Sequence, residues 1–182
     1  MGKGTQEADQ QRTVVENTNA NNNHQAVDLE EKKRTKLAAE ACTRSDRVLE
    51  DLLEWLSDTE EVTDAMDYFY AETGIQPYLL ICDGIDGKGG EITDDEAEDF
   101  LDELYTSLYA DEGHMIFVFM EYEESEYITF LYTGADADSL MDEDAKEIFL
   151  TNADRYYTDS SLSDEAYFAK IFRDSADDIM GK

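Results

Sequence analysis

The sequence predicts an α/β fold, a three-layer α/β/α sandwich with a mixed sheet that combines a parallel crossover and an antiparallel hairpin. Two apolar runs typical of buried strands, over 75–82 and 115–120, are separated by one amphipathic helical segment. An alternating segment follows the second run after a turn too short for a crossover. Further amphipathic segments on both sides of these strands supply the two outer layers.

Apolar spacing and capping residues mark the expected helices. The first is predicted just after Ser45, where leucines and Val48 recur at helical spacing as far as residue 56. The second follows Thr59 and ends at Gly74, a residue type that favours helix C-caps. Thr93 and Glu96 have the spacing of a capping box and start the third. Two more helices, over about 141–152 and from residue 163, complete the chain.

Three strands are expected between these helices. Pro77 stands near the start of the first, where the missing N–H is tolerated. The second begins after Gly113 and should run parallel to the first, because a whole helix separates the two. The third covers 127–133 and pairs with the second as an antiparallel hairpin across the turn at 123–125.

The chain divides into three predicted segments. Residues 1–26 are rich in Gln, Asn and Thr and contain few large apolar side chains, so we expect a flexible polar tail. Residues 27–44 are expected to form a helical or linker arm with a thin apolar face. Residues 45–182 hold the apolar patterns and form the α/β domain.

Acidic residues dominate the charge, with 46 Asp and Glu against 14 Lys and Arg and a formal net charge of −32. This balance excludes nucleic acid as a partner, because binding to the phosphate backbone requires basic side chains. It allows cations or a basic protein partner, whose identity the sequence does not give. No apolar stretch is long enough to span a membrane. We therefore expect a soluble monomer that meets a membrane only through a segment absent from this chain.

Motifs of nucleophilic catalysis and of zinc binding are not found. There is no G-x-S-x-G, H-E-x-x-H or P-loop, and the glycine-rich run 84–90 lacks the closing Gly-Lys-Ser/Thr. Cys42 and Cys82 have no zinc-ligand spacing with His24 or His114. Cys82 follows an apolar run and is predicted to be a buried, inert thiol. His114 is interpreted as a strand-boundary residue rather than a general base.

Carboxylates gather in the turns at both edges of the predicted sheet. Asp83 and Asp86 follow the first strand, whereas Asp111 and Glu112 precede the second, at the opposite edge. Ca²⁺ and Mg²⁺ prefer oxygen ligands of this kind. Two carboxylates 4 Å apart repel each other by about 1 kcal/mol even in water, so a cation would stabilise such a cluster. The sequence thus predicts a divalent-cation site for Ca²⁺ or Mg²⁺.

The order of these motifs resembles the TPM domain family, over roughly Leu52 to Met180. The motifs are Thr-Gly-Ile-Gln at 73–76, Asp-Glu-Gly-His followed by an apolar strand at 111–119, Gly134 after the hairpin, and Leu-Met-Asp at 140–142. The family includes bacterial membrane-tethered proteins and plant thylakoid proteins linked to photosystem II repair. The resemblance implies an α/β/α sandwich, divalent-cation binding, phosphatase activity in some members, and a membrane-tethered location outside the cytoplasm.

Matching the family motifs residue by residue gives the first choice of metal ligands. The acidic turn before the central strand corresponds to Asp111 and Glu112, and the acidic helix start after Gly134 corresponds to Asp142, with Asp136 nearby. The chain departs from the family at Glu112, where relatives often have Asn, and at the Ala-Asp-Ala-Asp run 135–138. Asp83 and Asp86 are the second choice and do not depend on the resemblance.

The sequence thus predicts a TPM-like, divalent-metal-binding accessory or interaction domain of a membrane-attached protein. One alternative is a metal-dependent phosphatase, in which carboxylates hold a cation that polarises a phosphoryl oxygen. A second alternative is an acidic module that binds a basic partner, which would bind less tightly as salt rises.

Overall fold

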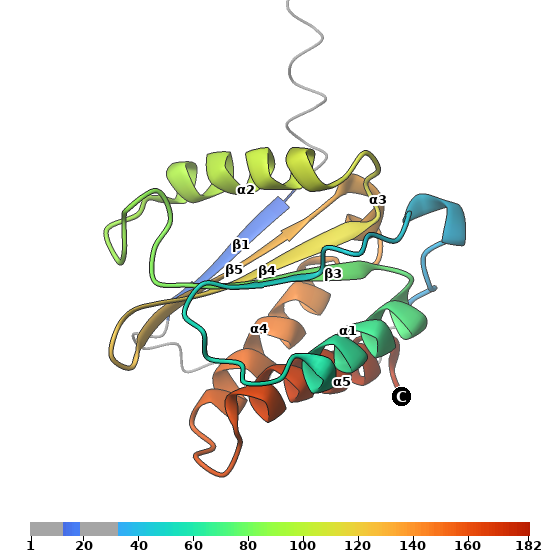
Figure 1. Ribbon diagram of the computed structural model, residues 1–182. Helices are drawn as coiled ribbons and strands as arrows, with labels where there is room; N and C mark the ends of the chain where they lie inside the picture. Colours follow the sequence, from blue (N-terminus) through green and yellow to red (C-terminus); the bar gives the residue numbers. More distant parts are fainter. Residues whose placement is uncertain (1–12, 19–32) are drawn as a thin grey trace, which may run out of the picture.

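A five-stranded mixed sheet forms the centre of the computed structural model, which describes residues 13–18 and 33–182 (Figure 1). The strand order is β1-β5-β4-β3-β2. The strands are β1 (Thr13–Thr18), β2 (Leu49–Asp51), β3 (Gln76–Cys82), β4 (His114–Glu123) and β5 (Glu126–Thr133). Strands β2, β3 and β4 are parallel to one another, whereas β5 pairs antiparallel with both β4 and β1. The predicted parallel crossover and antiparallel hairpin are confirmed.

Helices cover both faces of the sheet, which confirms the three-layer sandwich. Helix α2 (Asp94–Leu108) lies on one face, and α1 (Glu60–Thr73), α4 (Glu143–Tyr157) and α5 (Asp164–Met180) lie on the other (Figure 1). A short helix α3 (Ala135–Asp138) follows β5, and a 3₁₀ turn η1 (Ala39–Ala41) precedes β2.

Successive side chains of the central strands point into two separate cores, as the alternation of a β-strand requires. Phe117, Phe119 and Leu131 pack beneath α1, α4 and α5, whereas Val118 and Phe130 pack beneath α2. All five are fully buried or nearly so. The sheet is therefore apolar on both faces, and its polar functional groups have to lie at the ends of its strands.

Local signals fix the predicted helix ends. Thr93 and Glu96 form the reciprocal capping box that begins α2. Gly74 ends α1 with a left-handed φ of +77°, and a Cβ there would lie 2.6 Å from the Leu37 carbonyl oxygen. Glycine is required at this position by both its φ and the close approach of the chain.

The helix predicted after Ser45 is wrong. Leu49–Asp51 forms the edge strand β2, and an irregular loop follows it up to α1. The Asp51 carboxylate accepts the backbone N–H groups of Leu53 and Leu56, at 3.1 and 2.8 Å, and so closes the chain into a turn. A side chain that satisfies backbone donors in this way competes with helix formation.

The flexible tail predicted for residues 1–26 is wrong at Thr13–Thr18, which pair with the outer edge of β5 as β1. This segment contains β-branched residues, and β5 would otherwise present unpaired backbone groups at the sheet edge. The remainder of the tail and residues 27–32 of the arm lie outside the described residues.

Residues 33–44 of the predicted arm form no α-helix. They run along the domain with only the turn η1, and the Leu37 N–H donates to the Thr73 carbonyl at 2.8 Å. The Leu37 side chain packs against the core and Cys42 is buried, so the arm belongs to the packed domain. Among the described residues, no helix combines the length and the apolar character needed to cross a bilayer.

Candidate metal centre at the start of strand β4

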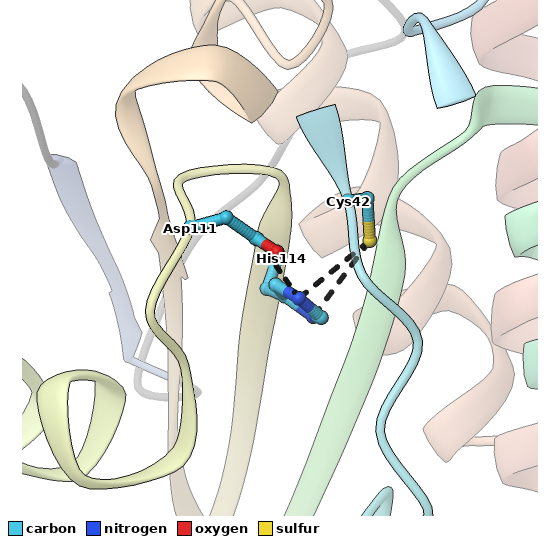
Figure 2. Close-up of side chains that lie close together, drawn as sticks. All are labelled: Cys42, Asp111 and His114. Carbon is cyan, nitrogen blue, oxygen red and sulfur yellow. Dashed lines mark hydrogen bonds and ion pairs between the residues drawn. The ribbon is translucent and has the colours of Figure 1, made fainter. Parts of the chain in front are cut away.

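Cys42, Asp111 and His114 lie together at the N-terminal end of β4 (Figure 2). Their ligand atoms are all within 4.8 Å of one another. Within residues 13–18 and 33–182, this is the one group of three or more Cys, His, Asp or Glu ligand atoms that approach so closely. It brings together the arm, the α2–β4 turn and the first residue of β4.

Close backbone packing holds the arm against this turn. A Cβ on Gly113 would lie 2.2 Å from the Ala41 carbonyl oxygen, so only glycine lets the two segments approach so closely. The Thr43 N–H donates to Asp111 Oδ2 at 2.7 Å. The Gln76 side chain also binds both backbone groups of Ser45, at 2.7 and 2.9 Å, and so fixes the arm beside β3.

The imidazole of His114 contacts both other members of the group. His114 Nε2 lies 3.0 Å from Asp111 Oδ1, while Cys42 Sγ lies 3.6 Å from Nε2 and 3.8 Å from Nδ1. The Tyr109 ring stacks on the imidazole with centroids 3.6 Å apart and an interplanar angle of 7°. Because the sulfur is nearly equidistant from both nitrogens, it packs against the ring and is not aimed at one nitrogen alone.

Burial keeps the thiol and the imidazole uncharged near pH 7. Cys42 is 4% exposed, and burial raises the pKa of its thiol to about 11, although a backbone hydrogen bond from Gln76 opposes the change. His114 is fully buried, and desolvation lowers its pKa despite the opposing effect of the Asp111 carboxylate. The group therefore combines a neutral imidazole, a protonated thiol and a carboxylate.

These donors can hold a metal ion. Sulfur, imidazole nitrogen and carboxylate oxygen together are ligands of zinc and related transition metals. Around a tetrahedral zinc ion, neighbouring ligand atoms lie about 3.4 to 3.6 Å apart. The 3.6 Å between Cys42 Sγ and His114 Nε2 matches this spacing, but the sulfur has to turn from its position between the two ring nitrogens toward Nε2. The 3.0 Å between Nε2 and Asp111 Oδ1 needs to open by a few tenths of an ångström. The donor set does not suit the predicted Ca²⁺ or Mg²⁺, which bind through oxygen.

A Cys–His–Asp arrangement also occurs in cysteine hydrolases, where the thiolate is the nucleophile. Such a nucleophile needs a lowered thiol pKa and access for the substrate. Here the pKa of Cys42 is raised and both Cys42 and His114 are buried. The environment favours a ligand role over nucleophilic catalysis.

Of the four first-choice ligands, Asp111 alone belongs to this group. Glu112 Oε2 accepts the Ala135 N–H at 3.1 Å, at the beginning of α3. Asp142 is the N-cap of α4, where it accepts the Ala145 N–H at 3.0 Å and pairs with Arg34 at 2.9 Å. Asp136 is exposed. Glu112 and Asp142 thus cap helices, the ordinary role of acidic residues at helix starts.

The second-choice ligands lie at the other end of the sheet, in the loop after β3. Asp83 is exposed and lines an open depression of about 580 Å³ with Gly90, Tyr122 and other residues. Asp86 is exposed in a turn with a φ of +52° and does not line this depression. No ligand group of the kind formed by Cys42, Asp111 and His114 includes either residue within the described part of the chain.

Cys42 and His114 were not among the metal ligands predicted from the sequence. They are 72 residues apart, so no local spacing could connect them. The sequence offered one indication of these ligands. Cysteine and histidine are rare in this chain, with two of each, and one of the histidines, His114, stands three residues after Asp111. The prediction for Cys82 is confirmed, since it is a buried free thiol whose pKa burial raises to about 11.

Comparisons with known proteins leave the family open. No protein-family model matches the sequence, and no curated protein matches it. The resemblance to the TPM family stays a prediction that depends on the motifs quoted above.

Proposed function

We propose that this chain is an accessory α/β domain that binds a zinc-class divalent metal ion through Cys42, Asp111 and His114. The supporting observation is the convergence of three different ligand types from distant segments within 4.8 Å. Chelation by three residues that are already close requires little ordering of the chain, which lowers the cost of binding.

Protons compete with the ion at this site. Because the pKa of the Cys42 thiol is raised to about 11, the ion has to displace the thiol proton before the sulfur can bind it. The imidazole of His114 needs no such step near pH 7, since its pKa is lowered. Binding is therefore expected to release a proton and to strengthen as pH rises.

A buried hydroxyl beside the group gives further support. Among the described residues, the Tyr109 hydroxyl has no hydrogen-bond partner although the residue is only 8% exposed. Leaving such a group unsatisfied costs about 1–3 kcal/mol. The Tyr109 ring stacks on His114, so this unsatisfied hydroxyl belongs to a side chain that contacts a proposed ligand directly.

The proposed ion would have mainly a structural role. It would join the arm, through Cys42, to the sheet, through His114 and Asp111. A structural ion adds its binding free energy to the stability of the fold. An accessory role in a membrane-attached protein, with a protein partner still to be identified, remains the prediction from the family resemblance.

Titration with Co²⁺ tests the proposal, because a thiolate ligand gives Co²⁺ an intense near-ultraviolet absorption that oxygen ligands do not. We expect saturable binding with this absorption in the wild type and its loss in Cys42→Ala. Cys82→Ala is the matched control, since it removes the other buried free thiol, at the end of β3. Zn²⁺ should displace Co²⁺, whereas Ca²⁺ and Mg²⁺ should not.

Equal binding by wild type and Cys42→Ala would contradict the proposal. Binding of Ca²⁺ that depends on Asp136 or Asp142 would restore the carboxylate site predicted from the sequence. Turnover of an aryl phosphate that disappears with chelator and with Asp111→Asn would instead favour the phosphatase alternative.

A further inference from the structure

A second candidate site lies at the opposite end of β4, about 23 Å from His114 along the strand. It is a cavity of about 370 Å³ between the end of β4, the loop before α1, and the connection from α4 to α5. Five aromatic side chains line it: Trp55, Phe119, Tyr156, Tyr157 and Tyr167.

Four of these rings, Trp55, Phe119, Tyr157 and Tyr167, contact one another in turn at different angles. The Trp55 and Phe119 rings meet edge to face at 5.7 Å and 61°, and Phe119 lies 6.0 Å from Tyr157. Tyr157 and Tyr167 in turn cross at 73° with centroids 6.2 Å apart. The Tyr167 hydroxyl donates to the Ala153 carbonyl, which does not line the cavity, so this side chain is anchored by contacts outside it.

The loop that carries Trp55 is held in a strained conformation. Glu54, just before the tryptophan, has a left-handed φ of +55°. Such a conformation costs roughly 1–3 kcal/mol in a residue other than glycine and clusters at binding sites. Asp51 holds the loop on both sides of Trp55 by accepting the Leu53 and Leu56 N–H groups. Glu165 holds it further along the chain by accepting the Ser57 N–H and hydroxyl at 2.8 Å.

Negative charge faces the aromatic wall without a cation among the lining residues. Glu121 is half-buried, Asp159 and Asp164 are exposed at the rim, and no Lys or Arg lines the cavity. Burial raises the pKa of Glu121, and the Asp164 carboxylate raises it further. Lys170 lies over the Tyr156 ring at 4.7 Å, but it pairs with Asp174 outside the cavity.

We infer that this cavity binds a small organic cation with an alkylammonium group. Aromatic faces attract such cations through their negative quadrupole, and quaternary ammonium groups are recognised by aromatic cages. The neighbouring carboxylates of Glu121 and Asp164 repel each other, and a bound cation would supply the positive charge that balances them. The position fits as well, since ligands of open α/β sheets bind beyond the carboxyl ends of the strands.

Fluorescence titration with choline tests this inference, because Trp55 is the single tryptophan of the chain and reports on the cavity directly. We expect choline to change the Trp55 emission in a saturable way at constant ionic strength. 3,3-Dimethyl-1-butanol has the same shape without the charge and should bind at least about fivefold more weakly.

Two variants test whether the charge of Glu121 contributes to choline binding. Glu121→Gln should weaken choline binding about fivefold or more. Asp83→Asn removes the same charge from an exposed residue outside the cavity and should leave the affinity unchanged. Equal affinity of the wild type for choline and its neutral analogue would overturn the inference, as would equal weakening in both variants. The metal proposal is unaffected by either result, because it depends on different residues.

Discussion

The two ends of strand β4 offer different chemistry to a ligand. At the N-terminal end, His114, Cys42 and Tyr109 are buried, and burial keeps the thiol protonated and the imidazole neutral. At the C-terminal end, Glu121 and exposed carboxylates face a cavity lined by rings. One end presents soft donors in a closed site, and the other presents charge and aromatic faces in an open one.

In a chain with a net charge of −32 carboxylates are abundant, so their density alone does not identify a metal site. Several carboxylates already have structural roles, such as the caps made by Glu96 and Asp142 and the turn closed by Asp51. The donors proposed to bind metal come together where tertiary packing buries a thiol and an imidazole beside a single carboxylate.

The largest effect is expected from a methyl group at the closed end. In Gly113→Ala the new Cβ would meet the Ala41 carbonyl at 2.2 Å, and the arm has to move away from β4. We expect a loss of about 3 kcal/mol in the free energy of unfolding, measured by urea denaturation. Gly90→Ala is the control at the other end, because its Cβ meets only the half-buried Tyr122 ring, which can move. Similar losses of unfolding free energy in both variants would contradict the proposed difference between the two ends of β4.

Removal of one charge at each end should have unequal effects. Asp111 accepts the Thr43 and Gly113 N–H groups and contacts His114, so Asp111→Asn should destabilise the domain by about 2 kcal/mol and weaken metal binding. Asp164→Asn at the exposed rim should change the stability by no more than about 0.5 kcal/mol. Thermal unfolding of both variants measures this difference, and a larger loss at Asp164 would reverse the comparison.

The two ends should respond to acid with opposite signs in the metal-free protein. The pKa of His114 is lowered in the folded state, so below about pH 6.5 only the unfolded chain takes up its proton and stability falls. The loss is at most about 1.4 kcal/mol per pH unit. The pKa of Glu121 is raised above 4.5 in the folded state, so on acidification the folded protein takes up this proton before the unfolded chain does. Protonation of Glu121 therefore increases the stability of the fold as the pH falls toward 4.5.

Urea denaturation of the wild type and His114→Gln between about pH 7.5 and 5.5 checks the histidine contribution. Subtracting the two profiles removes the effect of the carboxylates common to both proteins. The difference should change below about pH 6.5 and stay flat above it. A difference that is flat throughout would show that His114 is not held neutral by the fold.

Local signals in the sequence were sufficient for most of the fold. The capping box at Thr93 and the C-cap at Gly74 each depend on a few neighbouring residues, and both are present. Strand β2 was missed because three residues are too short to show a period, and the leucines around it imitate a helix. Strand β1 was missed because its pairing with β5 joins segments more than 100 residues apart.

The candidate metal centre was harder to predict from the sequence, because it also depends on contacts between distant segments. Asp111 was found because its turn precedes an apolar strand, which is a local pattern. Its partner Cys42 reaches it only because Gly113 lets the arm pack against that turn. Neither hydrophobic periodicity nor motif spacing predicts such a contact between distant segments.

X-ray absorption at the zinc edge, on protein loaded with one equivalent of Zn²⁺, tests the central claim most directly. The site predicts one sulfur at about 2.3 Å together with nitrogen and oxygen ligands at about 2.0–2.2 Å, and the sulfur should vanish in Cys42→Ala but remain in Cys82→Ala. A zinc shell made of oxygen alone, identical in all three proteins, would contradict it.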